Sequence, residues 1–446
     1  MEGKSIEALA LEMMRKRGIS IGEVYLLDTK GTTISVNEGV VERLEIGKER
    51  GASFRVFEDG RLCFSYTTAL SSQGLCQAIE RAVNSAKHTT PDEANDLPRN
   101  GEELPSVLTY DPQQEAIPVE EKIEFARQIE RYARQHDPRI TKFRESAYID
   151  ALGKIFIAST LGLHRSYRFS HCVGYSVPVA VEGGSAQTGF ESDHALALPS
   201  LSAERIGQGA AAMAVAKLGA RSYGTRRVDL VLDPRVTAGL FGALAPALYA
   251  DNVLKGKSLF AHKLGEAVAT EHLTLIDDGA LEGGGRAAPI DGEGVATGET
   301  PLIREGILTY YLHSTYTARK MGAQLTGNSI RSSYHSPPRV GSTNLYPKPG
   351  NLGREELLAG VTDGLYISEV MGLHTVNPIS GEYSLGALGQ VIARGELTEP
   401  VEGIAIAGNV LDLLGSVMAV ASDLRLFYHG GGGATVLLEG VSVSGK

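Results

Sequence analysis

The chain has 446 residues, a net charge of −10 and 42% hydrophobic residues. This length allows large cores in two or three domains, and the acidic balance disfavours nucleic acid as a partner, because phosphate binding without sequence preference needs a basic face. No stretch has the pattern of a signal peptide or a membrane-spanning helix. We therefore expect a cytoplasmic protein with no membrane partner. Cys63, Cys76 and Cys172 form no Cys-x-x-Cys pair, which predicts reduced, buried thiols.

The first part of the chain predicts an α+β unit over residues 1–90. Two amphipathic helices, at 5–17 and 71–88, flank short strand-like runs. Between the runs, Asn37-Glu38-Gly39 and Glu58-Asp59-Gly60 have the composition of hairpin turns. The order predicts a curved antiparallel sheet with helices on one face. The expected strands lie at 23–27, 32–36, 40–46, 52–58 and 61–66.

A second α+β unit is predicted after a linker. Residues 91–118 are polar and rich in proline, which is typical of a linker or a long surface loop. Residues 119–220 then give helix, strands and helix, with the helices at 119–136 and 202–218. The fold class is therefore α+β, with an N-terminal α/β region of two units with curved antiparallel sheets.

The C-terminal domain, residues 227–446, opens on a strand and an apolar helix. Asp233 provides an N-cap carboxylate after the branched run 228–232, and Pro234 fits the first helical position. No charged residue occurs from 236 to 250, and a helix that is apolar on all sides is usually buried. Pro246 should kink this helix. We expect a mostly antiparallel β domain wrapped around the buried apolar helix, with shorter helices at 264–269, 314–321, 355–361 and 410–420.

Three ordered segments carry a family resemblance. They are residues 231–279, which begin VLDPRVTAGLFGALAPALYADNVLKGK, residues 327–350, GNSIRSSYHSPPRVGSTNLYPKPG, and residues 369–390, EVMGLHTVNPISGEYSLGALGQ. Together they resemble the TldD/PmbA family, whose members are called modulators of DNA gyrase. The similarity extends over essentially the whole chain.

The branch of that family is decided by an absent metal motif. Members of the TldD type carry His-Glu-x-x-x-His on this helix and a distant cysteine, which together bind a zinc used for peptide hydrolysis. In this sequence Phe241, Gly242 and Pro246 stand at the first His, the Glu and the second His. None of the three can ligate a metal, no His-Glu dipeptide occurs anywhere, and the C-terminal half has no cysteine. The chain therefore resembles the PmbA/TldE branch, and zinc is expected only in a TldD-type partner.

A rival metal site could use His262 and Glu266, which would share one face of a helix at i and i+4, together with Glu271 and His272. The simpler interpretation is a solvated or capping helix edge.

Histidines in turn-rich segments are further candidates. His335, His374 and His429 could line a groove, although surface or core histidines are the commoner case. Residues 429–433, HGGGG, resemble the oxyanion loop of some esterases, yet no Gly-x-Ser-x-Gly elbow is present. We expect a flexible turn between two strands there.

The resemblance also implies that peptides lie near the strands around residues 369–387. A sheet edge can take up an extended peptide through backbone hydrogen bonds. Alternatively, the segment is an ordinary hairpin, or its edges are buried between subunits. The candidate groove residues are Leu373, His374, Thr375, Val376 and Asn377.

The sequence thus favours a metal-less TldE/PmbA-type subunit of a TldD/TldE-like metalloprotease complex that acts on unfolded peptides. Its expected partner is a zinc-bearing TldD-type subunit. We expect the chain to be inactive by itself and to form a homodimer when alone. Two alternatives are a self-sufficient peptidase with unrecognised ligands such as His262 and Glu266, and a regulatory module related to gyrase or to a toxin–antitoxin system.

Overall fold

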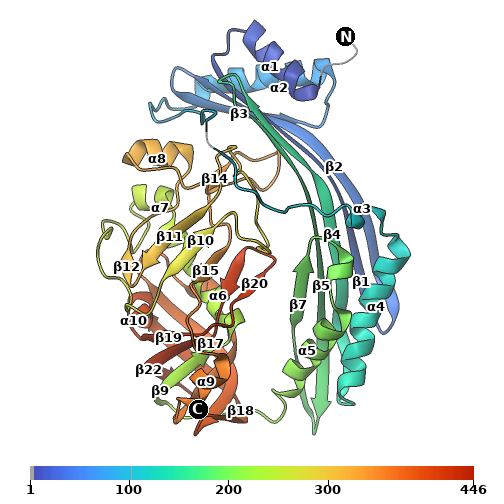
Figure 1. The fold of residues 1–446 in the computed structure, drawn as a ribbon, viewed down its shortest axis with the longest axis vertical. Coiled ribbons are helices and arrows are strands. Elements are labelled where there is room, and N and C mark those ends of the chain that lie inside the picture. Colours follow the sequence, from blue (N-terminus) through green and yellow to red (C-terminus); the bar gives the residue numbers. More distant parts are fainter. Residues whose placement is uncertain (1–4, 102, 446) are drawn as a thin grey trace.

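The computed structural model describes residues 5–101 and 103–445. In the N-terminal half, one long curved sheet runs through both predicted α+β units (Figure 1). Strand β1 pairs with β4 from Glu23↔Ser159 to Val36↔Ser146, so the two units share a single antiparallel sheet. Its strand order is β3-β2-β1-β4-β5-β6, with β7 also pairing with β5. The strands are β1 (Ile21–Asn37), β2 (Val40–Glu58), β3 (Arg61–Thr67), β4 (Ile140–Ser159), β5 (His164–Glu182), β6 (Ser185–Thr188) and β7 (Glu191–Ala195).

The strands are longer than their sequence pattern predicts. The polar residues 28–31, predicted to separate two strands, lie inside β1, because its ladders with β2 and β4 continue through them. The hairpin turn after β1 is confirmed. Glu38 and Gly39 both have positive φ, at 54° and 75°, as a tight two-residue connection requires.

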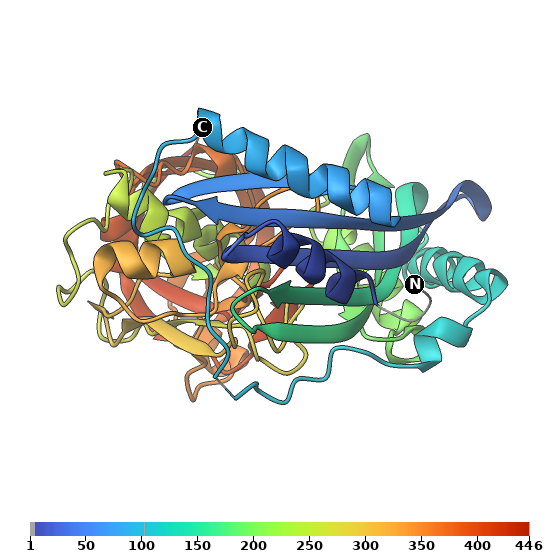
Figure 2. The same ribbon diagram turned by 90° about the horizontal axis from the view of Figure 1, so that it is seen from above.

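Helices cover one face of this sheet (Figure 2). Near its upper end α1 and α2 pack against Val24, Phe54 and their neighbours, and further along α4 and α5 pack against Ile34 and Tyr148. Ser71 and Ser202 cap α2 and α5 by accepting hydrogen bonds from backbone N–H groups. The helices are α1 (Ile6–Lys16), α2 (Ser72–Ser85), α3 (Gln113–Ala116), α4 (Val119–His136) and α5 (Ala203–Val215), with 3-10 turns η1 (Ala86–His88) and η2 (Leu198–Ser200).

The cysteines differ in burial. All three are free thiols, and Cys63 and Cys172 are buried as predicted. Cys76 on α2 is only partly buried, and its Sγ lies 2.8 Å from the guanidinium group of Arg17 and 3.3 Å from the carboxylate of Glu80.

The C-terminal domain contains a closed five-stranded barrel. Strands β22, β9, β16, β17 and β18 are neighbours in this order, and β22 pairs with β18 to close the ring. Only the β9/β16 ladder of the barrel is parallel, so the predicted mostly antiparallel domain is confirmed. The barrel strands are β9 (Arg226–Leu232), β16 (Asp363–Met371), β17 (Glu382–Ala393), β18 (Glu396–Asn409) and β22 (Val436–Ser444), extended by β8 (Arg221–Ser222) and β19 (Val417–Val420).

A second sheet and two small helices complete this domain. The sheet has the order β12-β11-β10-β15-β21-β20, and a separate ladder joins β13 to β14. Its strands are β10 (Leu275–Asp278), β11 (Glu299–Arg304), β12 (Ile307–Leu308), β15 (Leu345–Pro347), β20 (Arg425–Phe427) and β21 (Gly431–Gly433); the ladder is β13 (Ser329–Ile330) with β14 (Arg339–Val340), and the helices are α8 (Thr315–Met321) and α9 (Arg354–Ala359).

Two predicted helices are corrected. Residues 264–269 form turns rather than a helix, and Ala267 instead makes a β-bridge to Ile307. The helix expected at 410–420 ends early as α10 (Val410–Leu414), because Val417 enters strand β19 and pairs with Leu438. In both places pairing with a distant segment decides the local conformation.

The predicted linker lies against the C-terminal domain. Asp92 accepts hydrogen bonds from Lys320, at 2.8 Å, and from Tyr316, while Asp96 pairs with Arg319, all three on or beside helix α8. Within the described ranges, no helix is long and apolar enough to cross a membrane.

Candidate functional site

The apolar helix predicted at the start of the C-terminal domain is α6 (Pro234–Leu244). Asp233 caps it by accepting a hydrogen bond from the backbone N–H of Arg235 at 2.8 Å, and Tyr366 donates to the other carboxylate oxygen. Pro246 then ends the α-helix, and the chain continues through the 3-10 turn η3 (Ala245–Leu248) to α7 (Ala250–Leu254). The predicted interruption at Pro246 is confirmed.

Helix α6 is buried on one side only, which corrects the expectation of burial on all sides. Phe241 is 6% exposed and packs in the main apolar core, together with Val236 and Leu244. Gly242 is exposed, and a Cβ placed there would have no neighbour within 4 Å. At Gly242 the helix backbone is therefore open rather than packed.

The glycines after His429 form a strand, not the flexible turn that their composition predicts. Residues Gly431 to Gly433 are strand β21, which pairs with β15 and β20. A Cβ on Gly433 would lie 1.8 Å from the carbonyl oxygen of Pro234, so only glycine lets this strand touch the first turn of α6. The strand therefore lies directly beside the first turn of the helix that carries Phe241 and Gly242.

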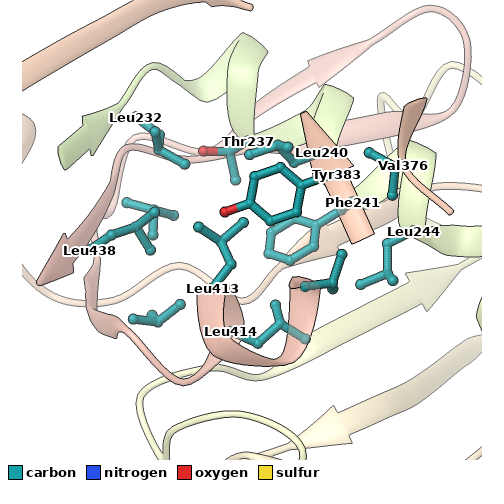
Figure 3. Close-up of a pocket in the computed structure, with 13 residues that line it drawn as sticks. Leu232, Thr237, Leu240, Phe241, Leu244, Val376, Tyr383, Leu413, Leu414 and Leu438 are labelled. Atoms are coloured by element: carbon teal, nitrogen blue, oxygen red, sulfur yellow. The ribbon is translucent and has the colours of Figure 1, made fainter. Parts of the chain in front are cut away.

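Next to Phe241 is a small apolar cavity of about 40 Å³ (Figure 3). Two hydroxyl groups occur among its aliphatic walls. Thr237 Oγ1 is buried without a hydrogen-bond partner, and burial raises the pKa of Tyr383 to about 12. Sequence patterns gave no signal for either residue, because both look like ordinary core positions. The cavity is lined by Leu232, Thr237, Leu240, Phe241, Leu244, Val376, Tyr383, Val410, Leu413, Leu414, Val417, Val436 and Leu438.

One of the candidate groove residues, Val376, lies in the wall of this cavity. Leu373, His374 and Thr375 form the 3-10 turn η4 (Leu373–Thr375), Val376 lines the cavity, and Asn377 begins the next turn. Leu373 packs on α6, where a Cβ on Gly239 would be 2.9 Å from its Cδ1.

This segment has no free backbone donors for an added strand at its centre. The N–H groups of Thr375, Val376 and Asn377 donate to carbonyl oxygens of Gly372, Leu373 and Glu382. A peptide near this turn would therefore be held through side chains, whereas the sheet-edge pairing considered from the sequence would need those donors.

A cluster of aromatic and imidazole side chains joins the N-terminal sheet to the loop before β21. The hydroxyl of Tyr428 lies 2.8 Å from Nε2 of His171, and Nε2 of His194 lies 3.1 Å from the carbonyl oxygen of Gly283. Burial lowers the pKa of His171 to about 4 and also lowers the pKa of His194 and His429. At neutral pH all three imidazoles are uncharged.

The rival metal ligands are not arranged as proposed. His262 has a left-handed backbone with φ of 66° and lies in a turn, and Glu266 pairs with Lys263 at 3.4 Å. Because no helix forms there, the i, i+4 geometry is absent. His335 packs beside Tyr66 and Tyr334, and His374 is exposed on η4. Among residues 5–101 and 103–445, no group of three or more His, Cys, Asp or Glu residues could hold a metal ion.

Helix α6 is tied to the N-terminal sheet by an ion-pair cluster. Glu191 on β7 pairs with Arg235 of α6 at 2.9 Å and with Arg425 of β20. Burial alone would raise the pKa of Glu191, but the two guanidinium groups hold it below its usual value.

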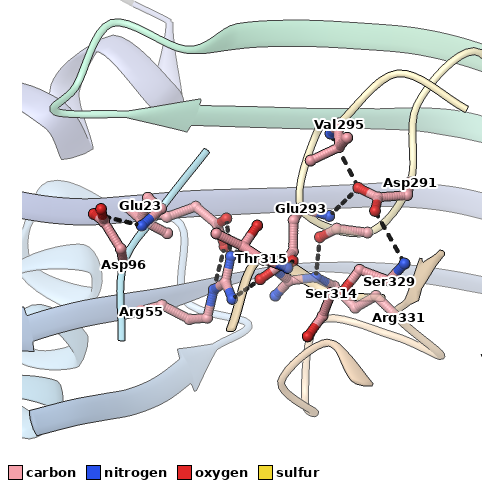
Figure 4. A network of polar contacts seen from close by, with 12 residues as sticks. Glu23, Arg55, Asp96, Asp291, Glu293, Val295, Ser314, Thr315, Ser329 and Arg331 are labelled. Atoms are coloured by element: carbon pink, nitrogen blue, oxygen red, sulfur yellow. Dashed lines mark hydrogen bonds and ion pairs between the residues drawn. The ribbon is translucent and has the colours of Figure 1, made fainter. Parts of the chain in front are cut away.

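A second contact between the two halves is ionic and fully buried; we call it the ionic interface (Glu23, Arg55, Glu293 and Arg331) (Figure 4). Arg55 pairs with Glu23 at 2.5 Å and with Glu293 at 2.6 Å, and Arg331 pairs with Glu23 at 2.7 Å. Every one of these side chains is at most 5% exposed. Nearby Asp291 accepts hydrogen bonds from the backbone N–H groups of Glu293, Val295 and Ser329.

The curved sheet, the closed barrel and helix α6 define a three-part protein of the kind described as PmbA/TldA metallopeptidase. Family models with that description match domain 1 over residues 22–86, the central domain over 112–218 and the C-terminal domain over 225–445. The chain belongs to the PmbA/TldD family.

Two relatives align with this chain over most of its length. Metalloprotease PmbA of Escherichia coli O157:H7 is 28% identical over 424 residues, which covers 94% of this chain and 91% of that protein. A metalloprotease of Methanocaldococcus jannaschii is 29% identical over 407 residues, which covers 89% and 88%.

Solved structures show the same fold. A Thermotoga maritima protein proposed to modulate a DNA gyrase superimposes with a TM-score of 0.91 at 27% identity and covers 98% of this chain and 99% of that chain. TldE from Thermococcus kodakarensis has a TM-score of 0.90 at 22% identity, with 98% and 100% covered.

The residues at the zinc-motif positions do not fit a metal. Phe241 is a hydrocarbon buried among leucines, Gly242 has no side chain, and Pro246 lies in a 3-10 turn without a donor atom. Zinc needs nitrogen, sulfur or oxygen ligands in a fixed geometry. We therefore derive no chemical step through a metal on this chain.

Proposed function

We propose that this chain is the metal-less, TldE/PmbA-type subunit of a TldD/TldE-like metalloprotease complex. In this role it holds unfolded peptide and supports a zinc-bearing TldD-type partner that performs the hydrolysis. The observation that carries the proposal is the chemistry of Phe241, Gly242 and Pro246, which replace a ligand, a base and a second ligand with groups that can do none of these tasks.

The surroundings of α6 support a peptide-holding role. The apolar cavity beside Phe241 is bordered by Val376, and the exposed residues His374 and Thr375 on η4 directly precede it in the chain. An apolar recess with a few polar groups at its edge is the usual form of a site that orients an apolar side chain. Peptide specificity would then come from side-chain contacts at Leu373 to Asn377.

Reconstitution tests the proposal. The chain, a TldD-type partner and a mixture of the two would be assayed for cleavage of an unfolded peptide that carries a quenched fluorophore. We expect no cleavage by the chain alone and faster cleavage by the mixture than by the partner alone. Cleavage by the isolated chain, or a mixture no faster than the partner, would contradict the proposal.

A matched pair of histidine variants localises the effect. His374→Ala removes an exposed side chain on η4 and should raise the KM of the mixture, whereas His136→Ala, at the exposed end of α4, should leave it unchanged. Both variants should still form the complex, which size-exclusion chromatography would check.

A further inference from the structure

A second groove lies on the helix-covered face of the N-terminal sheet, away from α6. It has a volume of about 590 Å³ and runs between the first turn of α1 and helix α3. Its floor is formed by strands β1, β2 and β4, and Arg168 of β5 lies at its side. Figure 2 shows α1 crossing this face of the sheet.

The groove is cationic in an acidic protein. It is lined by five basic side chains and by three carboxylates, although the whole chain carries a net charge of −10. An excess of one charge in a concave site attracts ligands of the opposite charge. The basic residues are Lys30, Lys48, Arg50, Lys154 and Arg168, and the acidic residues are Glu7, Asp28 and Glu115.

Strand register places like charges directly opposite each other. Lys30 on β1 faces Lys48 on β2, and Lys154 on β4 faces Arg168 on β5 on one side and Asp28 on β1 on the other. Like charges at directly opposite positions destabilise a sheet. Both pairs lie in one groove, where a bound anion would offset the repulsion between their positive charges.

The carboxylates of the groove do not neutralise all of these cations. Asp28 pairs with Arg50 at 3.1 Å and lies 4.0 Å from Lys48, and Glu115 pairs with Arg168 at 3.0 Å. Within the described part of the chain, neither Lys30 nor Lys154 has a carboxylate oxygen within 4.0 Å. The ammonium group of Lys154 lies 4.1 Å from the centre of the Phe156 ring.

The other wall of the groove is apolar. Ile6, Leu70 and Phe156 are each partly exposed there. The N-terminal turn of the 11-residue helix α1 also reaches the groove, and the Ser5 side chain makes no capping hydrogen bond to it. The positive end of the helix dipole adds to the attraction for an anion, although the acidic Glu7 lies in the same turn.

We propose that this groove binds a small organic phosphate of the nucleoside polyphosphate type. Its phosphates would lie between Lys30, Lys48 and Lys154, because lysine ammonium groups bind phosphate as point charges. Its ring would lie on the apolar wall beside Phe156. This site does not depend on the proposed role in peptide hydrolysis.

Calorimetric titration of the whole chain with adenosine triphosphate tests the site. The double variant Lys30→Gln, Lys154→Gln should weaken binding by about tenfold or more, since each change removes one charge partner. Lys142→Gln, on the exposed surface of β4 outside the groove, should bind like the wild type. No binding at millimolar nucleotide, or equal affinity of the double variant and wild type, would overturn the proposal.

Three further measurements test the like-charge pairs, the apolar wall and the size of the ligand separately. Without ligand, the double variant should melt at the same or a higher temperature than the wild type, and a lower melting temperature would overturn the like-charge argument. Pyrophosphate should bind more weakly than the nucleotide if the apolar wall holds the ring, and equal affinity would overturn that contact. A single-stranded oligonucleotide that binds more tightly than the nucleotide would overturn the assignment to a small ligand.

Discussion

Two regions of the C-terminal domain differ in their chemistry: the ionic interface with the N-terminal half is charged, and the surroundings of helix α6 are apolar. At the ionic interface, buried arginines and glutamates from both halves of the chain pair with one another. Around α6, leucines, valines and Phe241 surround a cavity in which one hydroxyl has no partner. Ion pairs require a fixed geometry, whereas apolar walls tolerate changes of shape. The ion pairs of the ionic interface therefore fix the relative position of the two halves, whereas the apolar region around α6 keeps an unfilled cavity.

The largest expected effect comes from breaking the ionic interface. Arg55→Met should lower the free energy of unfolding by about 3–5 kcal/mol, because Glu23 and Glu293 would remain buried without their shared partner. Denaturant titration would measure the change. The control Arg43→Met removes an exposed ion pair to Glu45 and should leave the free energy of unfolding nearly unchanged, because solvent screens that pair. Equal losses of unfolding free energy in the two variants would show that the buried ion pairs contribute no more stability than an exposed pair.

The titration of Asp291, beside the ionic interface, gives a smaller effect. Burial and then the neighbouring Glu293 raise the pKa of Asp291 to about 7, above the unfolded value of about 4. A carboxyl group with a raised pKa binds its proton more tightly in the folded state. Its stabilising contribution is therefore complete below about pH 4 and is lost as the pH rises toward 7.

Asp291→Asn removes this titration and tests its sign. Over that pH window, wild-type stability should fall relative to the variant by roughly 2 kcal/mol. Denaturant titrations of both proteins at pH 4.5, 5.5 and 7 would provide the comparison. A wild type that gains stability relative to the variant as the pH rises would contradict the assigned direction.

The smallest effect concerns the open side of α6. Gly242→Ala should raise the free energy of unfolding by up to about 1 kcal/mol, because the helix gains a better former and the new Cβ meets no neighbour. Gly433→Ala, at the contact between β21 and α6, should instead destabilise the protein, since its Cβ would collide with the backbone of Pro234. Thermal unfolding would compare the two. Loss of stability in Gly242→Ala would mean that this side of the helix is packed.

The sequence predicted those features that depend on neighbours along the chain. The Asp233-Pro234 start of α6, its end at Pro246 and helix α4 follow from caps and periodicity. The ionic interface could not be predicted, because Glu23 and Arg331 are 308 residues apart and neither lies in a recognisable motif. The strand at Gly431 to Gly433 was missed for a related reason: its glycines serve a close approach to α6, and local composition shows only a turn.

The candidate site was predicted in part. The interpretation of Phe241, Gly242 and Pro246 as vacant metal positions stays a prediction; in the structure Phe241 is buried and Gly242 is exposed. The cavity with Thr237 and Tyr383 was not predicted, because its walls come from strands and helices that meet only after the barrel closes. The role of Leu373 to Asn377 in holding peptide stays a prediction.

Metal analysis of the purified chain, prepared in the presence of zinc and then dialysed, tests the central claim most directly. The account predicts well below one zinc ion per chain, with the same value for wild type and for Phe241→Leu. One tightly held zinc ion per wild-type chain that is lost in Phe241→Leu or Pro246→Ala would contradict it.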